Sequence, residues 1–136
     1  MKTNILFWVL FFLFSGVFAQ VDDVEFREFV KDYHFAKSIN DEMVLNDIEG
    51  SPYLDEEYRP SRVYFKKVEK PLGSKLRYNA YSGEFEFSQG SYRFEITNKE
   101  ELDSIVYEGK SFIYTAYRSE GNRQAQGYLV RLERGS

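Results

Sequence analysis

The chain is 136 residues long, carries a formal net charge of −4, and contains a single His and no Cys. Acidic side chains spread along the sequence argue against nucleic acid and against anionic membrane surfaces as partners, because both are negatively charged themselves. The lack of Cys excludes disulfides, a lipid-modified Cys and a tight zinc site, and the length favours one domain.

The N-terminal residues have the pattern of an export signal. Lys2 gives a positive start, Ile5 to Phe14 is an unbroken apolar run, and Val17 and Ala19 occupy the small-residue positions before a cleavage site. The apolar stretch is shorter than the roughly 20 residues that a membrane span needs. We therefore expect a signal peptide over 1–19, no transmembrane span in the mature chain, and a single β-rich domain over 20–136. The expected location is periplasmic or extracellular.

Val21 to Ser38 is the stretch with a helical pattern in the mature sequence. Asp22 or Asp23 can cap its start. Apolar side chains recur at spacings of three and four residues, at Phe26, Phe29, Val30 and Tyr33. The residues from Val24 to Arg27 also alternate, so an extended strand stays an alternative there. Asn40 to Asp47 then mixes turn residues with a short apolar piece.

From Ile48 onward apolar and polar residues alternate, which is typical of strands. Between Lys75 and Thr97, Ser82-Gly83 and Gln89-Gly90 each have the composition of a two-residue hairpin loop. Tight loops would place four aromatic side chains on one face of a three-stranded meander: Tyr78, Phe85, Phe87 and Phe94.

In this register, Tyr78 and Tyr92 both face Phe87. The opposite face carries Glu86 between Asn79 and Arg93. We expect the aromatic face to be core, so Phe85→Ala should be severely destabilising, whereas Glu86→Ala should cost far less.

The remaining sequence predicts a short turn and more strands. Residues 98–101 have the spacing of a capping box, which predicts a single helical turn. Asp103 to Tyr107 and Ser111 to Tyr117 form a hairpin around Gly109-Lys110, with Val106 opposite Ile113 on a second apolar face. A polar loop and a last alternating strand, at Tyr128, Val130 and Leu132, follow. The predicted fold is mainly β: an antiparallel meander forming an open barrel or sandwich, with one N-terminal helix.

Three segments resemble a family of uncharacterised exported β-rich proteins of Gram-negative bacteria. They are Gly50 to Leu54 (GSPYL), Leu76 to Tyr81 (LRYNAY) and Glu84 to Phe87 (EFEF), within a similarity that covers roughly residues 48–117. The resemblance implies a β-rich exported domain and no known activity. Its members often run longer, which implies a short or C-terminally truncated member.

The chemistry-bearing residues form no recognisable motif. His34 is the one imidazole, and its neighbours Tyr33 and Phe35 favour a structural or surface role. Acidic residues between Asp41 and Glu57 could hold Ca²⁺, but their spacing matches no EF-hand, so a solvated loop is favoured. We therefore predict no catalytic, cofactor-binding or metal-binding residues, and no cofactor.

Two classes of function stay open. The favoured one is a non-catalytic exported module that binds a protein partner or an apolar ligand, and the alternative is a small secreted hydrolase of unrecognised type. The aromatic face of the meander discriminates between the kinds of binding. An open cavity there favours an apolar ligand, whereas a face filled by Phe26, Phe29 and Tyr33 favours a protein partner.

Overall fold

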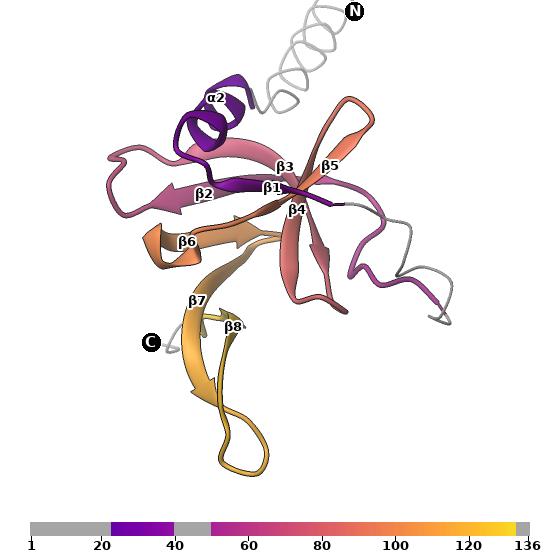
Figure 1. Cartoon of the computed structure of the whole chain (residues 1–136), viewed down its shortest axis with the longest axis vertical. Coiled ribbons are helices and arrows are strands. Elements are labelled where there is room, and N and C mark those ends of the chain that lie inside the picture. Colours follow the sequence, from indigo (N-terminus) through magenta and orange to yellow (C-terminus); the bar gives the residue numbers. More distant parts are fainter. Residues whose placement is uncertain (1–22, 40–49, 133–136) are drawn as a thin grey trace, which may run out of the picture.

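The structure is a computed structural model that describes residues 23–39 and 50–132. Eight antiparallel strands form one sheet in the order β1-β5-β4-β3-β2-β6-β7-β8, which curls into a half-barrel. Helix α2 (Val24–Asp32) packs against it (Figure 1). The predicted mainly β fold with one N-terminal helix is confirmed. The predicted export signal and the apolar piece after Asn40 lie outside the described residues.

From β2 onward the strands follow one another with short connections, whereas a long segment separates β1 from β2. They are β1 (Ala36–Ser38), β2 (Arg59–Phe65), β3 (Leu72–Asn79), β4 (Glu84–Gln89), β5 (Tyr92–Ile96), β6 (Leu102–Tyr107), β7 (Lys110–Arg118) and β8 (Gln124–Val130). The 3₁₀ helix η2 (Lys99–Glu101) between β5 and β6 confirms the predicted helical turn. No helix in the described parts of the chain is long and apolar enough to cross a membrane.

Helix α2 confirms the predicted helix and is shorter at both ends. Phe26 and Val30, four residues apart, are buried, whereas Tyr33 beyond the C-terminal end is exposed. The helix ends because His34 adopts a left-handed backbone conformation (φ 56°), after which the Phe35 N–H donates to the Val30 carbonyl at 2.8 Å. This turn directs the next residues into β1, which pairs with β5.

The core fills the inner side of the curled sheet. Phe85 of β4 contacts the rings of Tyr107, Phe112 and Tyr128 from β6, β7 and β8, at centroid distances of 5.4, 5.2 and 5.0 Å. These strands are not neighbours of β4, so the contacts form across the inside of the curl. The buried apolar residues are Phe26, Val30, Phe35, Val63, Phe65, Leu72, Leu76, Phe85, Phe87, Ile96, Leu102, Ile105, Tyr107, Phe112 and Tyr128.

The predicted hairpins form, but their registers are shifted by two residues. Tyr78 faces Phe85, and Phe94, rather than Tyr92, faces Phe87. In the third hairpin Ile105 faces Phe112, and the loop is residues 108–109 rather than Gly109-Lys110. Because side chains alternate between faces with a period of two, this shift keeps the aromatic face intact.

Local backbone chemistry explains the shifts. The Asn79 side-chain oxygen accepts hydrogen bonds from the N–H groups of Tyr81 and Ser82, so the first loop begins at Asn79 and spans 80–83. The second loop is residues 90–91, where Gly90 takes the positive φ. The predicted pairing of Val106 with Ile113 is wrong for the same reason: the third loop starts one residue earlier, and Val106 faces Ser111.

Candidate functional site

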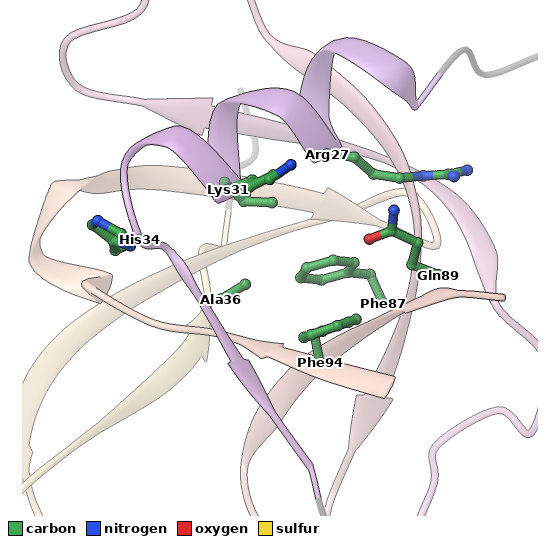
Figure 2. Close-up of a pocket in the computed structure, with 8 residues that line it drawn as sticks. Arg27, Lys31, His34, Ala36, Phe87, Gln89 and Phe94 are labelled. Atoms are coloured by element: carbon green, nitrogen blue, oxygen red, sulfur yellow. The ribbon is translucent and has the colours of Figure 1, made fainter. Parts of the chain in front are cut away.

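A pocket of about 340 Å³ opens between α2 and the β1–β5–β4 side of the sheet (Figure 2). We call it the α2 pocket. Its volume lies at the small end of the range of ligand-binding pockets. It is lined by Arg27, Val30, Lys31, His34, Ala36, Phe87, Gln89 and Phe94.

The floor of the α2 pocket is aromatic. Phe87 and Phe94 are directly opposite each other on β4 and β5, and their rings stack at a centroid distance of 5.4 Å (Figure 2). Phe26 of the helix meets Phe87 edge to face at 5.2 Å. Phe87 is buried and Phe94 is half-buried, so the core reaches the surface here. Phe87 and Phe94 both belong to the aromatic face that the alternating sequence predicts, so this face also forms the floor of the α2 pocket.

The helix side of the α2 pocket is basic. Arg27, Lys31 and His34 follow one another at spacings of four and three residues, which places them along one side of α2 and its C-terminal turn. The backbone of His34 is held by Thr97 Oγ1, which donates to the His34 carbonyl at 3.1 Å. The sequence favours a structural or surface role for His34. It is exposed, and it also lines this pocket.

A second pocket of about 400 Å³ lies on the other side of α2. It is lined by Phe29, Tyr33, Phe35, Phe65, Lys67, Val68 and Glu101. Three of these lining residues pack together: the Phe29 ring contacts the rings of Phe35 and Phe65, at centroid distances of 5.5 and 4.5 Å. The inner face of the sheet is thus covered along the middle by α2 and remains accessible on both sides of it.

The opposite face of β4 carries a buried charge. Glu86 is 2% exposed and accepts hydrogen bonds from Arg77 Nη2 and Asn79 Nδ2, each at 3.1 Å. Arg93 lies 4.0 Å from the same carboxylate. Sequence analysis placed Glu86 between Asn79 and Arg93. The structure instead pairs it directly with Arg77 across the strands.

Residues 50–58 cover this charge cluster. The Tyr53 ring lies 3.5 Å from the Arg77 guanidinium carbon, and the Tyr58 ring lies 4.5 Å from it. Arg93 Nη1 donates to the Tyr53 hydroxyl at 2.6 Å. Burial, with the nearby Glu86 carboxylate, raises the pKa of Tyr53 to about 12.

The three segments that carry the family resemblance meet at this cluster. The Leu54 N–H donates to the Tyr78 carbonyl at 3.1 Å, and the Ala80 N–H donates to the Pro52 carbonyl at 2.7 Å. Tyr53 and Arg77 then enclose the charge on Glu86. The GSPYL and LRYNAY residues therefore form a structural unit that holds the covering segment on the sheet, and they do not line the α2 pocket, whereas Phe87 at the end of the third segment does.

A second half-buried ion pair joins Glu84, at the start of β4, to Lys99 of η2. Burial raises the pKa of Glu84, and this effect outweighs the attraction of Lys99. Glu84 Oε2 and the Tyr128 hydroxyl are buried without a hydrogen-bond partner in the described part of the chain. Burial, and secondarily the charge of Glu84, raise the pKa of Tyr128, so that hydroxyl stays neutral.

The described part of the acidic segment, at Asp55 and Glu57, forms ion pairs with Arg59. Arg59 Nε lies 2.8 Å from Asp55 Oδ2 and 3.3 Å from Glu108 Oε1, and Arg59 Nη1 lies 3.2 Å from Glu57 Oε2. The hydrogen bond from Arg59 lowers the pKa of Asp55. Within residues 23–39 and 50–132, no group of three or more metal-ligating side chains gathers. The acidic residues of this segment from Asp41 to Glu49 lie outside the described ranges.

Comparison of the chain with protein families, with curated proteins and with solved structures finds no significant match. The resemblance to exported Gram-negative proteins therefore stays a prediction.

Proposed function

We propose that the protein is an exported, non-catalytic binding module and that the α2 pocket holds an apolar ligand. The stacked pair of Phe87 and Phe94 carries this proposal, because it brings a continuous aromatic surface from the core to an opening. Pockets of this kind bind through apolar area, with a few polar groups that orient the ligand. The signal pattern over residues 1–19 supports a periplasmic or extracellular location.

The composition of the pocket supports binding rather than catalysis. Among the described residues, its lining contains an imidazole at His34 but no carboxylate, hydroxyl or thiol that the imidazole could activate. The hydrolase alternative would instead require Glu84, whose raised pKa is the kind of perturbation seen in catalytic acids. Its partner Lys99 and the surrounding tyrosines also suit a structural ion pair, so binding stays the favoured function.

A solvatochromic naphthalene dye tests the proposal. The mature chain keeps no Trp, since Trp8 lies in the predicted signal peptide, so dye emission can be excited without interference from indole. We expect saturable binding to the purified mature protein. Phe94→Ala should weaken it about tenfold, because half of the stacked floor is removed.

Tyr92→Ala is the matched control. Tyr92 lies on the same strand, is 68% exposed and does not line the α2 pocket, so this variant should bind the dye like the parent. Ala36→Leu provides a second variant, which places a larger side chain in the pocket without removing core. A parent protein that binds no dye, or tight binding by both Phe94→Ala and Ala36→Leu, would refute the proposal.

A further inference from the structure

We infer that the ligand of the α2 pocket is a single-chain amphiphile with an anionic end group, such as a medium-chain carboxylate. This inference rests on the proposed function and specifies its ligand. It follows from the distribution of charge around the aromatic floor and from the volume of the pocket.

The charges that line the α2 pocket are all of one sign. Arg27 and Lys31 are basic, and none of the lining side chains that the structure describes is acidic, although acidic residues outnumber basic ones in the whole sequence. A cluster of one sign beside an apolar surface attracts a ligand of the opposite charge and raises its local concentration.

These basic side chains differ in how far the protein itself neutralises them. Arg27 Nη2 forms an ion pair with Asp23 Oδ1 at 2.5 Å, which leaves Arg27 as a structural link along the helix. Lys31 forms no ion pair with any described residue and is exposed. In Figure 2 its side chain lies beside α2 on the helix side of the pocket, across from the rings of Phe87 and Phe94. Lys31 is therefore the cation best able to receive an anionic end group.

The volume sets the size of the apolar part. About 340 Å³ corresponds to roughly ten water molecules of liquid, and because a methylene group is about as large as a water molecule, a chain of roughly ten carbons fits. A chain lying on the rings of Phe87 and Phe94 would be buried, while its end group reached the basic rim. A ligand of the same chain length without an anionic end group would be bound by the apolar contact with the rings alone.

A matched pair of ligands separates the two contributions. Decanoate and decanol have the same chain length but differ in charge, and each can displace the naphthalene dye from the mature protein at about pH 8 and low salt, where the carboxylate is ionised. We expect decanoate to bind about fivefold more tightly than decanol, with the difference shrinking as salt is added.

Variants of the rim identify the source of the preference. Lys31→Gln should reduce it to less than about twofold while leaving the affinity for decanol unchanged, because only the ion pair is lost. His34→Asn, which tolerates the left-handed backbone at this position, removes the imidazole N–H that can donate a hydrogen bond to the carboxylate, so it should reduce what remains. Lys37→Gln is the control, since Lys37 is an exposed lysine on β1 that pairs with Glu95 and does not line the pocket.

The results of these binding experiments distinguish a failure of the anionic end group from a failure of the proposed apolar-ligand function. If decanol and decanoate bind equally well, the anionic end group is refuted and the apolar pocket stands. If decanoate remains preferred in a Lys31→Gln, His34→Asn double variant, the selection arises elsewhere and the inference is again refuted. If neither ligand displaces the dye from the parent, the apolar-ligand function is refuted together with it.

Discussion

The two faces of β4 are equally buried but are covered in different ways. Phe85 and Phe87 on the inner face are 0% and 3% exposed, and Glu86 between them is 2% exposed on the outer face. Helix α2 covers the inner face and leaves a pocket on each side, whereas Tyr53 lies directly on the ion pair of the outer face. An apolar side chain loses little beside an opening, but burying a charged carboxylate is costly unless it is paired and hydrogen-bonded. A ligand site is therefore expected on the inner face.

The largest effect should come from removing the centre of the inner face. Phe85→Ala should lower the free energy of unfolding by about 3–5 kcal/mol, because Phe85 contacts rings from β3, β6, β7 and β8 and its loss leaves a cavity. Chemical denaturation measures this change, with exposed Tyr92→Ala as the control. Equal stabilities of Phe85→Ala and its parent would show that the face is not core.

The outer face should be nearly as sensitive, so the burial of Glu86 changes the expectation that Glu86→Ala would cost far less than Phe85→Ala. This substitution leaves Arg77 buried without its carboxylate, so we expect a loss of roughly 2–4 kcal/mol. A double-mutant cycle with Arg77→Met measures the coupling, and the double variant should be more stable than the summed single losses predict. Additive losses would mean that the pair is not a unit.

Tyr53→Phe should have a smaller effect, which depends on alkaline pH. It removes a hydroxyl that accepts a hydrogen bond from Arg93, so at neutral pH we expect a loss of about 1 kcal/mol. The folded pKa of Tyr53, about 12, lies above its ordinary value of 10.0, so its contribution is complete below pH 10 and falls as pH rises towards 12. Unfolding curves at several alkaline pH values should show the advantage of the parent over Tyr53→Phe shrinking. A constant difference would contradict the raised pKa.

The smallest predicted effects are opposite pH dependences of two carboxylates. The pKa of Glu84 is raised, so its contribution is largest at acid pH, and the parent should lose stability relative to Glu84→Gln as pH rises through the interval above 4.5. The pKa of Asp55 is lowered, so the parent should gain stability relative to Asp55→Asn as pH rises towards and past 3.8. Differences in melting temperature between about pH 2 and pH 7 test both, and a shared direction would refute one of them.

Much of the fold could be predicted because its pattern is periodic. The alternation at Phe85, Phe87 and Phe94 defined the inner face, and the spacing of Phe26 and Val30 defined the helix face. The α2 pocket could not be predicted, because it depends on how far α2 lies from β5, which no local pattern encodes. A weak signal existed in the spacing of Arg27, Lys31 and His34 along one side of the helical stretch.

The burial of Glu86 could not be predicted for a different reason. An acidic residue that alternates with aromatic ones is ordinarily read as facing solvent. Its cover comes from Tyr53 and Tyr58, at least 28 residues away in the chain, and the ion pair depends on a loop start that Asn79 determines. Sequence patterns report the faces of a strand, but they do not report whether a distant segment covers the polar one.

The two-residue shift of the first hairpin has a consequence for how the chain finds its native state. A hairpin with a tight Ser82-Gly83 loop would turn the same aromatic residues inward, so hydrophobic collapse alone does not discriminate against that misaligned intermediate. The misaligned form would place Glu86 opposite Asn79 and Arg77 opposite Ser88. The buried ion pair and the Asn79 hydrogen bonds are satisfied together in the native alignment, where Arg77 faces Glu86 and Glu84 faces Asn79. A buried ion pair that adds little stability compared with a well-packed apolar pair can in this way favour one hairpin alignment over another.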